Sequence, residues 1–260
     1  MASILLPRAL RRPVAAIYAF ARSADDIADE GDHDSATRLA LLDIYRDNLE
    51  SIGQGKTPSA PLFTALADTI RTHTLPLEPF YDLLAAFRQD VIKTRYADVD
   101  ELLQYCRLSA NPVGRLLLRL FRCDTETNVV LSDAICTGLQ LTNFLQDVGA
   151  DYERGRIYLP QDALRAHAVV PDDIPARRFG PGWQRLIQGE IERTRSLLLS
   201  GARLGSHLKG RFGLEIRLTI AGGLTILDKL QAINRIGFIT GARLTPVNWL
   251  YVLWRSHGIR

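Results

Sequence analysis

Long proline-free stretches constrain the fold of this chain more than any other feature of its sequence. They are rich in Ala, Leu, Arg and Gln, which are good helix formers. These stretches cover residues 14–57, 80–111, 113–159 and 183–245. Regularly spaced short strands joined by turn pairs are missing, and so are the glycine-rich strand-to-helix turns of α/β nucleotide-binding folds. The sequence therefore predicts a bundle of long helices.

The predicted helices can be placed from this pattern and from helix-start signals. They span residues 13–30, 35–53, 60–73, 78–93, 98–121, 125–151, 183–206, 211–237 and 246–256. Pro13 suits a first helical turn, and Ser35 and Asp124 suit N-caps. Asn111-Pro112 lies inside a helical pattern and predicts a kink or a break there.

The domain organisation follows from the remaining prolines and from the even composition. Four prolines and a Gly-Pro-Gly run between Pro160 and Gly182 predict the longest irregular connection. No internal repeat and no shift in composition marks a boundary. We therefore expect a single domain over residues 1–260.

Composition and charge exclude several classes of protein. Hydrophobic residues make up 47% of the 260 residues and charged residues 23%, as in ordinary globular proteins. The net charge of +3, without a basic run interleaved with aromatics, gives no reason to expect nucleic acid as a partner. Three cysteines without a CxxC pair indicate neither a zinc site nor a disulfide framework.

The same features bear on location. No apolar run approaches the roughly 18 residues of a membrane span, so we expect a cytoplasmic protein. Aromatic residues beside a basic one in the segment from Trp249 to Arg255 leave peripheral contact with the inner membrane open. A buried C-terminal helix accounts for that segment equally well. The sequence specifies no oligomeric state.

The first candidate site lies on the helix predicted over residues 13–30. A helix turns by about 100° per residue. With Tyr18 placed at zero, Arg22 lies at roughly 40° around the helix axis, Asp25 at roughly 340° and Asp29 at roughly 20°. All four side chains therefore share one face. Two carboxylates at i and i+4 repel one another, which makes sense if a divalent cation binds between them. A solvated acidic helix end explains this segment alone equally well.

The second candidate site repeats this arrangement on the helix predicted over residues 125–151. With Gln140 as zero, Asn143, Asp147 and Asp151 fall at roughly 300°, 340° and 20°. Apolar residues flank this polar stripe on both sides, so we expect the helix to be buried. Buried carboxylates need partners or a metal. The repetition of the pattern on two helices favours a shared function.

The ligand chemistry points to a particular metal. Carboxylate oxygens without thiolate or clustered imidazole select Mg²⁺, with Mn²⁺ as the alternative. Mg²⁺ is typically shared between one or two carboxylates and substrate phosphates. Two aspartate pairs, Asp25 with Asp29 and Asp147 with Asp151, would form a clamp for a diphosphate leaving group.

These motifs resemble a known family. Asp25-Asp26-Ile-Ala-Asp29, the segment from Asn143 to Asp151 and the following Arg154-Gly-Arg-Ile-Tyr158 look like the two aspartate-rich motifs of the squalene/phytoene synthases. Tyr105-Cys106 with Val113-Gly114 resembles a third landmark of that family. The resemblance extends over nearly the whole chain. It implies an all-α isoprenoid-synthase bundle with a central cavity, a prenyl diphosphate as substrate and Mg²⁺ as cofactor.

The resemblance also implies roles for individual residues. Asp25, Asp29, Asp147 and Asp151 would bind the metal and act with Tyr105 in catalysis. The residues expected to hold the diphosphate or to close the site are Tyr18, Arg22, Gln140, Asn143, Arg154 and Tyr158.

Within the family, the segment from Ser109 to Leu116 looks most like the hydroxysqualene synthases of bacterial hopanoid biosynthesis. Such an enzyme would convert presqualene diphosphate and water into hydroxysqualene and diphosphate. A head-to-head prenyltransferase making presqualene diphosphate or phytoene would need the same clamp and stays an alternative. A non-catalytic assembly factor is a second alternative, although such relatives tend to lose the aspartates that this chain keeps.

Overall fold

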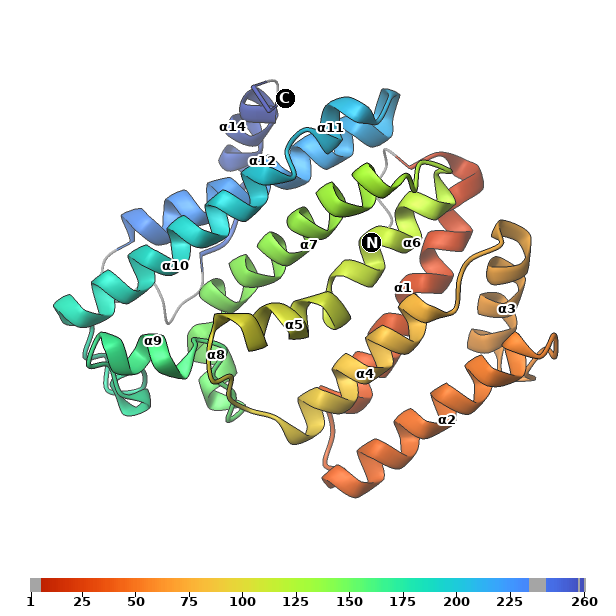
Figure 1. Ribbon diagram of the computed structural model, residues 1–260, viewed down its shortest axis with the longest axis horizontal. Helices are drawn as coiled ribbons and strands as arrows, with labels where there is room; N and C mark the ends of the chain where they lie inside the picture. Colours follow the sequence, from red (N-terminus) through yellow and green to blue (C-terminus); the bar gives the residue numbers. More distant parts are fainter. Residues whose placement is uncertain (1–5, 234–241, 257, 260) are drawn as a thin grey trace. The chain divides into compact units, whose positions relative to one another are not determined.

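The computed structural model describes residues 6–233, 242–256 and 258–259 (Figure 1). In this part of the chain the secondary structure is helical, apart from an isolated parallel bridge between Arg95 and Ile157. This confirms the predicted all-α class. The chain divides into two compact units, Met1–Lys93 with Arg107–Val129 and Thr94–Cys106 with Val130–Arg260. The single domain expected from the sequence stays a prediction.

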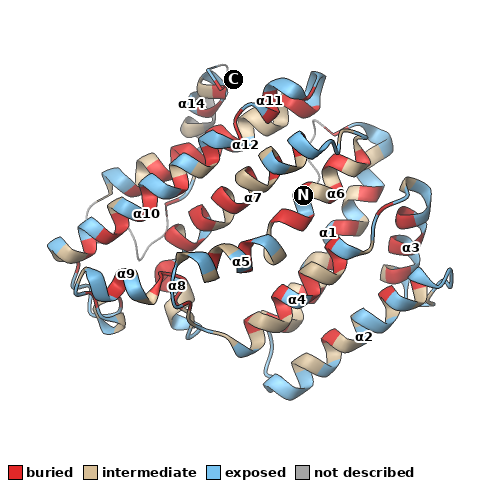
Figure 2. Cartoon of the chain, in the orientation of Figure 1, coloured by how far each residue is buried: buried red, intermediate tan, exposed pale blue. Residues whose placement is uncertain are grey.

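Unit 1 is built around its first helix. Its helices are α1 (Arg8–Asp29), α2 (Ser35–Gly53), α3 (Pro61–His73), α4 (Glu78–Ile92) and α6 (Asn111–Leu120). Helix α1 contacts each of the other four, and α4 also packs against α2 and α6. Figure 2 shows buried positions recurring along one face of α1 and α4, as expected for amphipathic helices around a shared core.

Aromatic rings fill the centre of unit 1. Phe20 of α1 is fully buried, and its ring centroid lies 5.4 Å from that of Phe80 at an interplanar angle of 86°. Phe63 and Tyr45 complete the cluster, with centroids 5.0 Å apart. Such edge-to-face contacts add to the stabilisation from burial alone. They fix α1, the helix that carries the first acidic stripe, on its neighbours.

Unit 2 contains most of the later helices. They are α8 (Val148–Glu153), α9 (Gln161–Ala166), α10 (Pro181–Ser200), α11 (Leu204–His207), α12 (Gly210–Ala232) and α14 (Pro246–Ser256), with a 3₁₀ turn over Pro171–Asp173. Helices α5 (Val99–Ser109) and α7 (Glu126–Gln146) contribute residues to both units. Within unit 2, α12 packs against α10, α11 and α14.

Glycines allow close approach of the helices in unit 2. A Cβ at Gly138 of α7 would lie 2.8 Å from Leu198 Cγ of α10, and a Cβ at Gly201 would lie 2.5 Å from the Leu131 carbonyl oxygen. A Cβ at Gly223 of α12 would lie 3.1 Å from Leu139 and 3.2 Å from Leu198. Residues with side chains would push these helices apart. The glycines therefore serve close packing.

Helix α14 is amphipathic. Val252 and Ser256 are buried, whereas Tyr251, Leu253 and Trp254 are exposed, Trp254 by 72%. The side chain of Trp249 lies outside the described residues. The helix expected over residues 246–256 is confirmed, and one of its faces is buried. Peripheral contact with a membrane stays a prediction.

The start signals of three helices differ from those expected. Helix α1 begins at Arg8, so Pro13 lies inside it and not in its first turn. Asp34, not Ser35, caps α2, because its carboxylate accepts a hydrogen bond of 2.8 Å from the Thr37 amide. Helix α7 begins at Glu126, and Thr125 Oγ1 accepts from the Asn128 amide at 3.3 Å. Asp124, which we expected as the cap, pairs with Arg119 at 3.0 Å.

Three long predicted helices are each divided in the structure. The helix expected over 183–206 is interrupted between α10, which ends at Ser200, and α11, which begins at Leu204. The break expected at Asn111-Pro112 occurs, because α5 ends at Ser109 and α6 begins at Asn111. The helix expected over 125–151 is interrupted at Asp147, between α7 and α8. The connection expected to be irregular contains α9 and the 3₁₀ turn. Helix α12 is described to Ala232, and residues 234–237 of its expected span lie outside the described residues.

Candidate active site

Helix α1 carries the first predicted stripe in unit 1. Tyr18 is 57% exposed, Asp25 and Asp29 are half-buried, and Asp29 is the last residue of the helix. The Arg22 guanidinium pairs with Asp25 at 3.0 Å, and with Asp26 at 2.7 Å. The helical register predicted for the four residues is thus present, and Arg22 is held beside the acidic end of the helix.

The junction of α7 and α8 carries the second stripe in unit 2. The helical hydrogen-bond pattern continues across the break, because the Asp147 amide donates to the Asn143 carbonyl at 2.9 Å and the Asp151 amide donates to the Asp147 carbonyl at 2.8 Å. Asn143 and Asp147 are exposed, Gln140 is half-buried, and the Asp151 side chain is 14% exposed. The i and i+4 relation of the two aspartates therefore survives the break.

The flanking residues are buried as predicted. Leu141, Phe144, Leu145 and Val148 are each 9% exposed or less. The expectation that the acidic residues themselves are buried holds for Asp151 and not for Asp147, because Asp147 lies where the helix breaks. The break presents this carboxylate toward solvent while its neighbours remain in the core.

Asp147 is nevertheless electrostatically perturbed. Desolvation by the surrounding protein raises the pKa of its carboxyl group above 3.8, and the nearby charges of Arg154 and Arg243 partly oppose the shift. A divalent cation would relieve this cost, because it favours the ionised carboxylate. The environment of Asp147 thus suits a ligand of a cation.

The loop after α8 continues from the second stripe. Arg154 Nη1 lies 3.9 Å from Asp151 Oδ1, a loose ion pair with a largely exposed arginine. Gly155 has φ of 79°, a conformation that glycine adopts without strain. This turn lets the Arg156 amide donate to the Asp151 carbonyl at 2.8 Å. The loop thereby folds Arg154 back toward the acidic pair.

Backbone pairing with a distant segment fixes this loop. The Ile157 amide donates to the Thr94 carbonyl at 3.0 Å, and the Gln161 amide donates to the Tyr96 carbonyl at 2.9 Å. Arg95 Nη1 donates to the Gly155 carbonyl at 2.6 Å. The segment 94–97 therefore determines the course of residues 155–162.

An aromatic cluster lies beside the second stripe. The predicted residues Tyr105 and Tyr158 are both buried, with ring centroids 6.0 Å apart. Phe144 stacks on Tyr158, with centroids 3.8 Å apart and an interplanar angle of 9°. Tyr96 is fully buried, and its centroid lies 5.4 Å from that of Tyr105 and 5.7 Å from that of Tyr158.

Tyr96 is the member of this cluster that the sequence interpretation missed. It lies after the end of α4, outside any predicted helix, so helical periodicity gives it no face. A signal that could have found Tyr96 is its place in an otherwise polar connection, Lys93-Thr-Arg-Tyr-Ala-Asp98. Tyrosine is buried more often than its polar neighbours there, so a tyrosine in such a connection indicates a contact with the core.

A small pocket lies next to these rings. It has a volume of about 10 Å³, enough for about one water molecule. Asp151, Arg156 and Tyr158 line it, together with Phe144, Val148, Ile157 and Leu159. One carboxylate, one guanidinium and one phenol ring thus converge within unit 2.

The residues of each stripe suit Mg²⁺ by their donor chemistry. Within the described residues, no three Asp, Glu, His or Cys side chains form a group that could hold a metal ion. Each stripe offers two aspartates, and Mg²⁺ needs only one or two protein carboxylates because water and phosphate oxygens complete its shell. That the two pairs lie opposite one another across a central cavity stays a prediction.

Comparison with known proteins identifies the class. Residues 1–249 match the squalene/phytoene synthase family. The chain belongs to this family. It is therefore an enzyme of squalene/phytoene synthase-type prenyl diphosphate chemistry, and enzymes of this family typically depend on Mg²⁺.

Several relatives bear more specific names. The hydroxysqualene synthase of Rhodopseudomonas palustris is 40% identical over 220 residues, which cover 84% of this chain and 74% of the relative. That of Zymomonas mobilis is 37% identical over 221 residues, 83% of this chain and 72% of the relative. The chloroplastic phytoene synthase 1 of Solanum lycopersicum is 32% identical over 259 residues, covering 97% of this chain and 62% of the plant protein.

Solved structures share the fold. The crystal structure of the squalene synthase HpnC from Alicyclobacillus acidocaldarius matches with a TM-score of 0.83 at 40% identity, covering 88% of this chain and 86% of that one. A dehydrosqualene synthase complex matches with a TM-score of 0.82 at 24% identity. The isoprenoid-synthase fold implied by the motifs is thereby confirmed. None of the described helices is long and apolar enough to cross a membrane.

Proposed function

We propose that this chain converts presqualene diphosphate and water into hydroxysqualene and inorganic diphosphate. The bond between the substrate carbon and the diphosphate oxygen breaks, and the leaving group takes the electron pair. The resulting cyclopropylcarbinyl cation rearranges, and a water oxygen bonds to the rearranged cation. The proton lost from that water balances the charge of the departing anion.

The observation that carries the proposal is the second stripe. There, Asp147 and Asp151 keep their i and i+4 relation across a helix break, beside the buried rings of Tyr105 and Tyr158. A polar, cation-binding edge against a water-poor aromatic surface is the environment that ionisation of an allylic or cyclopropyl diphosphate requires. The first stripe supplies the matching pair, Asp25 and Asp29.

Each residue has a distinct role in this proposal. Asp25, Asp29, Asp147 and Asp151 would hold Mg²⁺, which, when bound, would neutralise the charge developing on the leaving diphosphate. Arg22 and Arg154 orient and neutralise diphosphate oxygens, and Tyr18, Gln140 and Asn143 help to hold the anion. The hydroxyl groups of Tyr105 and Tyr158 donate to the departing diphosphate.

The bacterial relatives support the choice of substrate. The relatives named hydroxysqualene synthase are 33–40% identical to this chain, whereas those named phytoene synthase are 29–35% identical. The alternative is a head-to-head prenyltransferase that joins two prenyl diphosphates. Two observations favour it. Plant phytoene synthases match up to 99% of the chain, and a 40% identical solved structure is described as a squalene synthase.

Product analysis separates the two candidates. Purified protein with Mg²⁺ is incubated separately with presqualene diphosphate, farnesyl diphosphate and geranylgeranyl diphosphate, and the extracted products are identified by mass spectrometry. In ¹⁸O-labelled water, the proposed reaction gives a C30 alcohol that carries the label. Formation of presqualene diphosphate, squalene or phytoene without labelled alcohol would replace our proposal with the transferase.

Paired variants test whether the acidic stripes act in catalysis. Asp29→Asn and Asp147→Asn each remove one carboxylate charge, and turnover should fall by at least about 100-fold. Asp47→Asn in α2 and Glu153→Gln in α8 remove exposed charges outside both stripes and should leave turnover unchanged. If the stripe variants retained full function in cells, the assembly-factor alternative would be favoured.

A further inference from the structure

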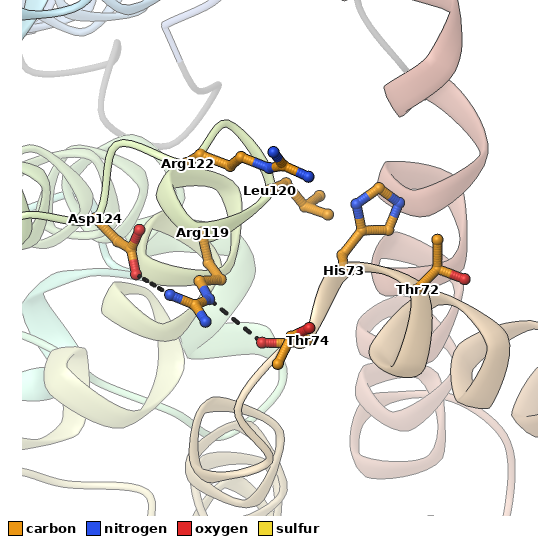
Figure 3. Close-up of a pocket in the computed structure, with 7 residues that line it drawn as sticks. All are labelled: Thr72, His73, Thr74, Arg119, Leu120, Arg122 and Asp124. Atoms are coloured by element: carbon orange, nitrogen blue, oxygen red, sulfur yellow. Dashed lines mark hydrogen bonds and ion pairs between the residues drawn. The ribbon is translucent and has the colours of Figure 1, made fainter.

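A hollow of about 350 Å³ lies in unit 1 where α3 and α6 end. Figure 3 shows the residues that line it: Thr72, His73, Thr74, Arg119, Leu120, Arg122 and Asp124. None of them belongs to either acidic stripe. The volume lies within the range of small-molecule sites, and the lining is mostly polar, with two arginines and one aspartate. This composition suits a small anion.

Two helix-ending turns of the same kind form the hollow. After α3, the Leu75 amide donates to the Ile70 carbonyl at 2.9 Å, and Thr74 has φ of 51°. After α6, the Cys123 amide donates to the Leu118 carbonyl at 3.0 Å, and Arg122 has φ of 54°. Both are Schellman turns, in which glycine is the usual residue at the left-handed position.

The hydrogen bonds within the hollow leave one arginine available. Arg119 Nη1 pairs with Asp124 at 3.0 Å, and its Nε donates to the Thr74 carbonyl at 3.3 Å. Arg122 is exposed, and its guanidinium makes no hydrogen bond or ion pair with the residues that the structure describes. Its guanidinium and the His73 imidazole point toward one another across the hollow (Figure 3).

The carbonyl groups at the C-terminal ends of α3 and α6 do not explain the position of the Arg122 side chain. Basic side chains near a helix C-terminus can bond its last carbonyl groups. Backbone amides already satisfy the Ile70 and Leu118 carbonyls, and Arg119 takes the Thr74 carbonyl. Because Asp124 offsets only one of the two arginine charges, the side chains that line the hollow keep a net positive charge.

We propose that this hollow binds a phosphate group, with Arg122 donating to its oxygens from one side and His73 from the other. Thr72 and Thr74 add hydroxyl donors at the rim. Arginine presents a planar fork of N–H groups that matches phosphate oxygens. Two sources share this chemistry, a free inorganic phosphate and the phosphomonoester headgroup of a lipid. The site is separate from the proposed reaction and does not depend on it.

Nuclear magnetic resonance of the histidine side chains tests binding locally. Inorganic phosphate is titrated into the full chain in EDTA, which keeps divalent cations from the aspartates. The His73 resonances, assigned with His73→Gln, should shift saturably with phosphate, while those of His33, His167 and His207 should not. Absence of a saturable shift at His73 would overturn the proposal.

A matched pair of variants tests the arginine. Arg122→Gly removes the guanidinium and places glycine at a left-handed position, so the turn still forms and the free protein should be at least as stable. Arg177→Gly is the control, because Arg177 is also exposed with φ of 54° in a Schellman turn but lies outside the hollow. Phosphate affinity should fall at least tenfold in Arg122→Gly and stay unchanged in Arg177→Gly. Equal affinities in the two variants would refute the site.

Vesicle sedimentation distinguishes the two sources of phosphate. Phosphatidylcholine vesicles are compared with vesicles that also contain phosphatidic acid, using the wild type and both glycine variants. Sedimentation that requires phosphatidic acid and Arg122 assigns the site to a lipid headgroup. If the His73 resonances shift with phosphate only when Arg122 is present, and no such sedimentation occurs, the site binds a free anion. Binding in either assay that is independent of Arg122 contradicts the proposal.

Discussion

The ring of Phe144 lies parallel to that of Tyr158, with centroids 3.8 Å apart and planes 9° from one another. Phe144 comes from α7, and Tyr158 comes from the loop after α8. The contact thus joins the helix that carries the second stripe to the loop that carries Arg154. It holds the Tyr158 hydroxyl group at a defined place relative to Asp147 and Asp151.

Substitutions at Tyr158 should separate the ring from its hydroxyl group. Tyr158→Phe keeps the stack, so its free energy of unfolding should lie within about 1 kcal/mol of that of the wild type. Tyr158→Ala removes the ring, and its free energy of unfolding should be lower by about 3 kcal/mol or more. Turnover of Tyr158→Phe should fall by about tenfold to 100-fold, because a donor to the leaving group is lost. Urea denaturation and steady-state kinetics measure the two effects. Wild-type turnover in Tyr158→Phe would exclude the hydroxyl group from the reaction.

Tyr96 should act as a positioning residue for Tyr105 and Tyr158. In Tyr96→Phe the ring contacts persist, so kinetics should stay close to the wild type. In Tyr96→Leu the neighbouring rings lose their support, and kcat should fall more than KM rises, since misplacement affects the transition state most. A change in KM alone in Tyr96→Leu would contradict this role. A loss of kcat in Tyr96→Phe as large as that in Tyr96→Leu would also contradict it.

The raised pKa of Asp147 predicts a pH dependence of metal binding. A metal ligand must be ionised, so Mg²⁺ affinity should decline as the pH falls toward this pKa, beginning at a higher pH than for an ordinary aspartate. Arg154 lowers the pKa of this carboxyl group, so Arg154→Gln should move the decline to still higher pH. Calorimetric titrations with Mg²⁺ at a series of pH values measure the affinity, and Arg177→Gln is the control. An unmoved profile in Arg154→Gln would contradict the assignment.

The same shift sets the sign of the effect on stability. A carboxyl group whose pKa is raised on folding disfavours the folded state increasingly as the pH rises from its unfolded pKa through its folded pKa. Without metal, Asp147→Asn should therefore be at least as stable as the wild type at neutral pH. This advantage should disappear in acid, below both pKa values.

Cys106 should be inert in the folded protein. Burial raises the pKa of its thiol to about 12, and burial raises that of Cys123 to about 11. At pH 8 only about one Cys106 thiol in 10⁴ would be ionised, and the thiolate is the reactive form. Mass spectrometry after iodoacetamide treatment should find Cys106 unmodified in native protein and modified in urea. Rapid native labelling of Cys106 would show that this part of α5 opens readily.

Asp228 should anchor α14 on α12. Its carboxylate pairs with Arg195 of α10 at 2.7 Å and also with Arg255 of α14. Asp228→Ala leaves two partly buried arginines without this partner and should cost about 1 kcal/mol of stability. Hydrogen exchange should quicken selectively in α14. Glu192→Ala, on the exposed face of α10, is a suitable control, and uniform exchange in both variants would contradict the anchoring role.

The parts of this fold that depend on local sequence were predictable. The register of Asp25 and Asp29 follows from the 3.6-residue period, and the break before Asn111 follows from a proline that cannot continue the hydrogen-bond pattern. The family resemblance made the isoprenoid-synthase fold predictable as well. The i and i+4 relation of Asp147 and Asp151 was also correct, although the sequence did not predict the break at Asp147.

The remaining features depend on contacts between distant segments. Pro13 lies within α1 because the helix extends back to Arg8, which no cap signalled. Tyr96 joins the aromatic cluster through backbone pairing with residues some 60 positions later, which periodicity cannot show. The packing role of Gly223 also depends on distant residues, because a Cβ there would lie 3.1 Å from Leu139 and 3.2 Å from Leu198.

The pairing of residues 94–97 with residues 155–162 has a consequence for divergence among related enzymes. Most of these bonds join main-chain amides to carbonyl groups, so they form with nearly any side chain at those positions. Packing limits changes at Ile157 and Leu159, which are buried, whereas a change at Arg156 leaves the main-chain path of the loop in place. A lineage could therefore alter what this loop presents to a substrate while inheriting the scaffold that presents it.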